Sequence, residues 1–152
     1  MKRETWIAGS VFAAVPVVVM SAAILCTWAI AHGASESLRI PFRLLCHGIA
    51  HRCYSMWNVP MPICARCTGI YIGMFSGLVF FVMVPWIYER WLRIAMYVAA
   101  GVLAVDGLTQ LARLRESTND LRLATGLAAG FTFGMWVLSA IERRDRRLFT
   151  IP

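Results

Sequence analysis

The fold of this chain is decided by TGIYIGMFSGLVFFVMVPWIY, residues 68–88, an apolar run without a charged side chain. It reaches the roughly 20 residues that an α-helix needs to cross the hydrocarbon core of a bilayer. Three similar runs lie at about 6–31, 94–112 and 123–141, and Asp106 is the one charged residue in any of the four. The sequence therefore predicts an all-α membrane protein, a bundle of four transmembrane helices.

The composition agrees with one integral-membrane domain over residues 1–152 and with the lipid bilayer as its surroundings. The chain is 59% hydrophobic and 15% charged, which is too apolar for a soluble globule of this size. Its formal net charge of +7 could indicate a nucleic-acid partner. The basic residues lie at the ends of the predicted helices rather than along one soluble face, so we expect none.

Basic residues near the C-terminus also predict the orientation. Arg143, Arg144, Arg146 and Arg147 follow the last apolar run and favour a cytoplasmic C-terminus. Four spans then bring the N-terminus to the same side. The long loop between the first and second helices is expected on the outer side of the membrane.

The second and fourth apolar runs begin alike. Residues 68–77 and 125–134 share a Thr-Gly pair and two further glycines at identical spacing. Glycines four residues apart lie on one helix face and let another helix approach closely. The pattern predicts close helix packing through these faces, including a possible homo-oligomer, and a chain built from two similar helical hairpins. Chance identity is the alternative, since glycine is common in membrane helices.

The loop before the second helix is rich in soft metal ligands. Residues 46–67 contain four of the five cysteines and two of the three histidines. The members are Cys46, His47, His51, Cys53, Cys64 and Cys67. Such a set can hold a metal or carry thiol chemistry, and the CxxC pair at a helix N-terminus beside an arginine favours thiolate over thiol. Buried, inert cysteines are the alternative.

The third apolar run carries an acid on a polar face. Asp106, Gln110 and Arg113 follow i, i+4, i+7 spacing and therefore share one side of a helix. A carboxylate within a span is costly and faces the bundle interior or a cavity. Asp106 is accordingly a candidate catalytic acid or base. The alternative is an ion pair with an arginine such as Arg122 that only holds helices together.

Further polar residues crowd the connection between the third and fourth helices. Glu116 is the second candidate catalytic residue, as a general acid or base. The candidate substrate-binding residues are Arg66, Gln110, Arg115, Asn119 and Arg122. The alternative for this segment is helix capping, because Ser117, Thr118 and Asn119 are typical N-cap residues.

Four segments carry a resemblance to a known family. They are Cys46-His47, PICARCTGIYIG at 62–73, DGLTQ at 106–110 and RESTNDLRLATG at 115–126. They resemble the signatures of small prokaryotic integral-membrane proteins classed as a domain of unknown function. The resemblance covers roughly the C-terminal two-thirds of the chain. It implies a multi-span fold in the cytoplasmic (inner) membrane of a prokaryote and carries no activity with it.

The resemblance also bears on the ligand set. In that family a serine usually stands where this chain has Cys53, and His51 departs from the pattern as well. The resemblance therefore implies Cys46, His47, Cys64 and Cys67 as the core ligands, with His51 and Cys53 as further candidates.

Three functions are compatible with these residues. Three thiolates and one imidazole suit tetrahedral Zn²⁺, with iron as a second choice, and such a site beside a polar pocket could act on a polar or anionic membrane-associated substrate. The first alternative is a four-helix membrane thiol–disulfide oxidoreductase that uses Cys64 and Cys67 and is coupled to quinone. The second is a metal-stabilised membrane scaffold without catalysis. The sequence leaves open whether the protein is an enzyme.

Overall fold

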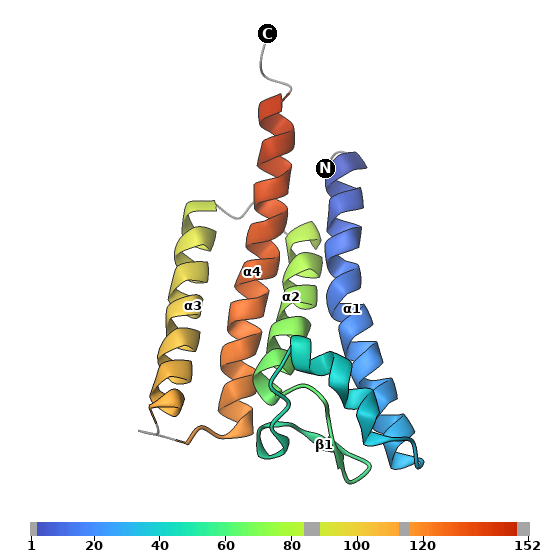
Figure 1. Ribbon diagram of the computed structural model, residues 1–152. Coiled ribbons are helices and arrows are strands. Elements are labelled where there is room, and N and C mark those ends of the chain that lie inside the picture. The colour runs from blue at the N-terminus through green and yellow to red at the C-terminus, as the bar shows by residue number, and fades with distance from the viewer. Residues whose placement is uncertain (1–2, 84–88, 113–115, 149–152) are drawn as a thin grey trace.

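The computed structural model describes residues 3–83, 89–112 and 116–148. In chain order its elements are α1 (Arg3–Ala31), the 3-10 helices η1 (Glu36–Leu44) and η2 (Ala50–Arg52), the strands β1 (Ser55–Met56) and β2 (Val59–Pro60), α2 (Ala65–Met83), α3 (Glu89–Leu111) and α4 (Asn119–Leu148). Figure 1 shows the four α-helices side by side in the order α3, α4, α2, α1, with the short elements gathered at one end of the bundle.

Four of the described helices are long and apolar enough to cross a membrane, over 9–31, 65–83, 90–111 and 119–143. Their outward faces keep large apolar side chains exposed, such as Leu25 and Val105, which are 63% and 62% exposed. Such faces suit lipid, whereas the backbone hydrogen bonds are satisfied within each helix. The predicted bundle of four transmembrane helices, with a Cys/His-containing loop after the first, is confirmed.

The second helix begins earlier than the apolar run that predicted it. It starts at Ala65 instead of residue 68, because the carbonyl of Cys64 accepts hydrogen bonds from the backbone N–H of Thr68 (2.9 Å) and from its hydroxyl (3.1 Å). This places Cys67 and Arg66 within the first turn. The helix is described as far as Met83, and the predicted residues 84–88 lie outside the described part of the chain.

The other helices also extend beyond their apolar runs. α4 begins at Asn119 rather than at residue 123, because the Thr118 hydroxyl accepts a hydrogen bond from the backbone N–H of Leu121 (3.3 Å) as an N-cap does. α3 begins at Glu89 rather than at residue 94, α1 at Arg3 rather than at residue 6, and α4 continues to Leu148. Hydropathy marks the membrane core, whereas capping groups decide where a helix begins.

The centre of the fold is a backbone-to-backbone contact between α2 and α4. A Cβ atom added at any of six glycines would lie closer than 3.0 Å to backbone atoms of the facing helix. The six are Gly69, Gly73 and Gly77 in α2 and Gly126, Gly130 and Gly134 in α4. Only glycine permits this approach, so the pattern that the sequence showed is used inside one chain, with the two glycine faces against each other.

The contacts of the two glycine faces are reciprocal. Gly69 faces the carbonyl oxygen of Leu123, and Gly126 faces that of Arg66. The same relation holds for each pair of positions 57 residues apart (69 and 126, 73 and 130, 77 and 134). Because α1 packs on α2 and α3 packs on α4, the arrangement agrees with two similar hairpins joined through their second helices.

The two ends of the bundle differ. The first turn of α1 and the last turns of α4 lie at one end, and the loop between α1 and α2 lies at the other (Figure 1). At the loop end, Met61 and Ile63 pack with three buried cysteines and with Ala23 of α1. This apolar cluster fixes the loop onto the helices and positions the residues described next.

Candidate metal centre and polar pocket

Cys46 reaches its position through a tight turn after η1. Its backbone N–H donates to the carbonyl of Phe42 (2.8 Å), which closes the end of the 3-10 helix. Two residues later Gly48 adopts the left-handed conformation, with φ +57°, which favours glycine. A Cβ there would also approach the carbonyl oxygen of Pro62 to 3.1 Å. The turn brings adjacent residues Cys46 and His47 to the same place.

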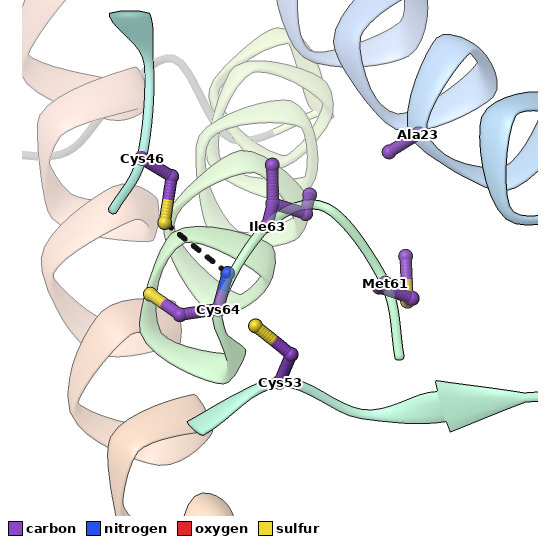
Figure 2. Packing of buried hydrophobic residues seen from close by; sticks show 6 residues of the cluster. All are labelled: Ala23, Cys46, Cys53, Met61, Ile63 and Cys64. Atoms are coloured by element: carbon purple, nitrogen blue, oxygen red, sulfur yellow. Dashed lines mark hydrogen bonds between the residues drawn. The ribbon is translucent and has the colours of Figure 1, made fainter. Parts of the chain in front are cut away.

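Cys64, just before α2, completes a group of three metal-capable side chains. The ligand atoms of Cys46, His47 and Cys64 all lie within 4.8 Å of one another. The backbone N–H of Cys64 donates to the sulfur of Cys46 (3.2 Å), as the dashed line in Figure 2 marks. Both cysteines are buried, whereas His47 is exposed. The group is therefore held by two buried thiols and is open on the histidine side.

The electrostatics of the cluster single out Cys46 as the preferred thiolate. The pKa of its thiol is lowered because the Cys64 thiol, and after it the Cys67 thiol, can hydrogen-bond to the Cys46 sulfur. The backbone N–H groups of Gly48 and Cys64 act in the same direction, against the effect of burial. Donating to Cys46 in turn raises the pKa of Cys64. Cys67, the fourth predicted ligand, is partly buried against the same cluster but does not belong to the group of three ligand atoms within 4.8 Å.

The remaining two candidate ligands are placed differently. The thiol of Cys53 is buried in the apolar cluster (Figure 2) and donates to the carbonyl of Ile49 (3.2 Å). Burial, followed by the charges of Cys64 and Cys46, raises the pKa of Cys53 to about 12, which keeps it protonated. His51 is exposed and lines a polar pocket. Neither belongs to the group of three ligand atoms within 4.8 Å.

A polar pocket of about 580 Å³ lies where η2 meets the start of α4. Its lining residues are His51, Arg52, Gln110, Glu116, Ser117, Thr118, Asn119 and Arg122. The loop is tied to α4 beside it, because Asn119 donates to the carbonyl of His51 (3.4 Å) and Tyr54 donates to Asp120 (3.0 Å). The pocket therefore forms only when the loop, α3 and α4 come together.

Four of the predicted catalytic and substrate-binding residues line this pocket. Arg122 donates through Nε to Gln110 (3.1 Å) and through Nη1 to Asn119 (2.9 Å). Gln110 and Arg122 are buried, while Glu116 is exposed. Arg115, also predicted to bind substrate, and Arg113 lie outside the described residues.

Asp106 and Arg66 do not line the polar pocket but pair with each other. Nη2 of Arg66 contacts Oδ2 of Asp106 in a salt bridge between α2 and α3, and the Asp106 side chain is 9% exposed. Asp106 also lines a separate, mostly apolar cavity of about 520 Å³ between α3 and α4. The ion-pair partner of Asp106 is therefore Arg66 and not Arg122, the arginine that the sequence analysis suggested. The reason is that Arg66, in the first turn of α2, faces α3.

The pocket also contains a residue that the sequence reasoning missed as a site residue. Arg52 lines it, and its Nε is buried without a hydrogen-bond partner among the described residues. The only sequence signal was its place between His51 and Cys53 in the ligand-rich loop.

The hairpin that follows was also unforeseen, with Trp57 and Asn58 at φ of 52° and 61° in the turn between β1 and β2.

Comparison with known proteins identifies the family. The profile of a family described as "Predicted membrane protein (DUF2085)" matches residues 46–136. The chain therefore belongs to this family. The matched segment begins at Cys46 and includes the cysteine cluster, the polar pocket and both glycine faces, but not α1.

Two archaeal proteins are similar to the chain. An uncharacterized protein of Methanocaldococcus jannaschii is 37% identical over 102 residues, which are 64% of this chain and 64% of that protein. An uncharacterized protein of Methanothermobacter thermautotrophicus is 37% identical over 100 residues, 66% of this chain and 88% of that protein. The chain thus spans about two-thirds of the length of the first relative. No solved structure matches it.

Proposed function

We propose that this member of the family is a metal-dependent membrane protein that binds Zn²⁺ at one membrane face, next to the polar pocket. The ligands are Cys46, His47, Cys64 and Cys67. The observation that carries the proposal is that the ligand atoms of Cys46, His47 and Cys64 lie within 4.8 Å of one another. Iron is the second metal that these ligands would accept.

The proximity of these three ligand atoms supports a compact tetrahedral site. With Zn–S bonds of about 2.3 Å, two sulfurs of a tetrahedral site lie about 3.8 Å apart. Cys67 is the fourth ligand of the proposal, since it packs against the cluster that contains Cys46 and Cys64. The buried thiols would anchor the ion, and the exposed His47 is the ligand that substrate or water could displace.

The neighbouring pocket supplies the residues for a reaction on a polar or anionic membrane-associated substrate. Bound zinc would contribute Lewis acidity and a nucleophilic water. Glu116, exposed in the pocket lining, is the candidate general base, and Gln110, Asn119 and Arg122 are the candidate substrate contacts. Asp106, through its pair with Arg66, is a candidate for a supporting role in proton transfer.

Metal analysis of the purified protein in detergent tests the metal site. We expect one zinc or iron per chain in the wild type and strong loss of metal in Cys64→Ser. The matched control is Cys26→Ser, because Cys26 is a buried cysteine of α1 outside the group of ligand atoms. Metal-free wild-type protein, or equal metal loss in both variants, would contradict the proposal.

A thiol–disulfide oxidoreductase is the alternative that the same side chains support. Cys64 and Cys67 meet Cys46 at the start of α2, and all five cysteines are free thiols in the structure. Thiol counting before and after reduction distinguishes the two functions. Metal-free protein with two disulfides and a redox-active quinone would favour the oxidoreductase. Stoichiometric metal with no effect of any variant on activity would favour the scaffold.

We also infer the orientation in the cytoplasmic membrane of a prokaryote. The basic C-terminal segment from Arg143 favours cytoplasmic termini, which puts the cysteine-rich loop on the outer side. Reporter fusions at the C-terminus would test this, since alkaline phosphatase is active only outside the cytoplasm and a fluorescent protein folds inside it. Active phosphatase fused to the C-terminus would show that the orientation is the opposite of the one proposed.

A further inference from the structure

The polar pocket holds a buried amide whose NH₂ group has no partner within the described part of the chain. Gln110 is 8% exposed, and its Oε1 accepts the hydrogen bond from Nε of Arg122. A guanidinium can only donate, so this bond fixes which end of the amide faces Arg122. Nε2 is left without an acceptor among the described residues, although it is buried. An amide group in this state can donate to an acceptor group of a bound ligand.

Arg122 is a buried cation whose hydrogen-bond partners among the described residues are all neutral. It is 6% exposed, and its hydrogen bonds go to Gln110 and Asn119, which are neutral. No acidic side chain of the described residues forms a salt bridge with it. A buried charge without a counter-ion is costly, whereas an anion in the pocket would compensate it.

Arg52, which belongs to the loop, adds a second guanidinium to the lining of the same pocket. Its Nε is buried and lacks a partner in the described part of the chain. Glu116 is the acidic side chain among the described lining residues, and it is exposed. The 30-residue helix α4 begins at Asn119 in the lining and adds the partial positive charge of its N-terminus.

We propose that this pocket binds a phosphate group. Two guanidiniums, a free amide and a helix N-terminus around one cavity match the charge and the several acceptor oxygens of a phosphate. The cavity of about 580 Å³ also leaves room for an organic portion of the ligand. The inference rests on the proposed function only in taking phosphate-containing molecules as the substrates of the metal centre. Phosphate binding in the pocket itself needs no metal.

Titration of the purified protein in uncharged detergent tests the inference. The probes are inorganic phosphate and short-chain phosphatidic acid, with short-chain phosphatidylcholine for comparison, each followed by calorimetry. Loss of one charge-assisted contact in Arg52→Gln should weaken binding on the order of 10- to 100-fold. Arg43→Gln removes the same charge from an exposed position of the same loop outside the pocket lining, and should leave affinity unchanged.

Each outcome decides between the interpretations. Tighter binding of phosphatidic acid than of inorganic phosphate identifies a lipid headgroup as the source, and equal binding identifies free phosphate. No saturable binding of either probe, or equal weakening in Arg43→Gln, overturns the proposal. Metal content measured on the same samples separates the two proposals: phosphate binding without metal removes only the metal centre, and metal without phosphate binding removes only this inference.

Discussion

The first turns of α2 take part in two contacts of opposite kinds. On the α4 side the contact is made by backbone atoms that approach one another at the glycines. On the loop side it is made by the thiols of Cys46, Cys64 and Cys67 together with apolar side chains such as Ile63. The first contact depends on the absence of side chains and the second on their chemical identity. The start of one helix can therefore fix the fold and hold a chemical site with little interference between the two contacts.

The glycine contact is expected to show the largest effect when it is broken. Gly130→Val places side-chain atoms against the carbonyl of Ile70, which is backbone and cannot move aside. We expect a loss of about 3 kcal/mol or more of stability, seen as little folded protein by size-exclusion chromatography and thermal unfolding.

The matched control for that variant lies in α3. Gly101 has no atom within 4 Å of an added Cβ, so Gly101→Val should change stability by no more than about 0.5 kcal/mol. Equal destabilisation by both valines would show that helix-to-helix approach is not what Gly130 provides.

Removal of the metal is expected to have an intermediate and local effect. With a chelator, or in Cys67→Ser, the loop over residues 46–63 should gain amide hydrogen exchange because the ligands that hold it to α2 are lost. The amides of α2 and α4 around Gly73 and Gly130 should keep their protection, since their contact contains no ligand. Equal loss of protection in both regions would mean that the two contacts form one cooperative unit.

The ion pair between α2 and α3 is expected to have the smallest effect. Asp106→Asn keeps an oxygen that can accept from Arg66 and removes only the charge, so we expect a loss of about 1–2 kcal/mol in thermal unfolding. Metal content should stay the same. A fall in activity well beyond the fall in stability would support a role for Asp106 in catalysis, and complete loss of folding would show that the pair is essential to the bundle.

The sequence predicted those parts of the fold that depend on local pattern. Apolar length gave the four helices, and the spacing of glycines gave the close packing, although not the fact that the two faces meet within one chain. The cap at Thr118 was also foreseeable, because hydroxyl residues precede the fourth apolar run. Each of these features rests on residues a few positions apart.

The arrangement of the site depends on contacts between distant residues and could not be predicted in the same way. The residue pattern alone did not choose between the two histidines of the loop, and His47 was favoured only through the family resemblance. The left-handed turn at Gly48 places His47, not His51, beside Cys46. The partner of Asp106 depends on which side of α2 faces α3, so that Arg66 and not Arg122 pairs with it. The role of Arg52 in the pocket appears only when η2 lies against the start of α4.

The interlocked backbones of α2 and α4 also limit how the protein can move. Because carbonyl groups of one helix lie against the glycines of the other, a shift of α2 along α4 by a single residue would drive side chains into backbone. The two helices are therefore expected to move together as one rigid unit. The walls of the polar pocket include Gln110 of α3 and Arg52 of the loop. Opening of the pocket is therefore expected to require movement of α3 or of the loop relative to the α2–α4 pair.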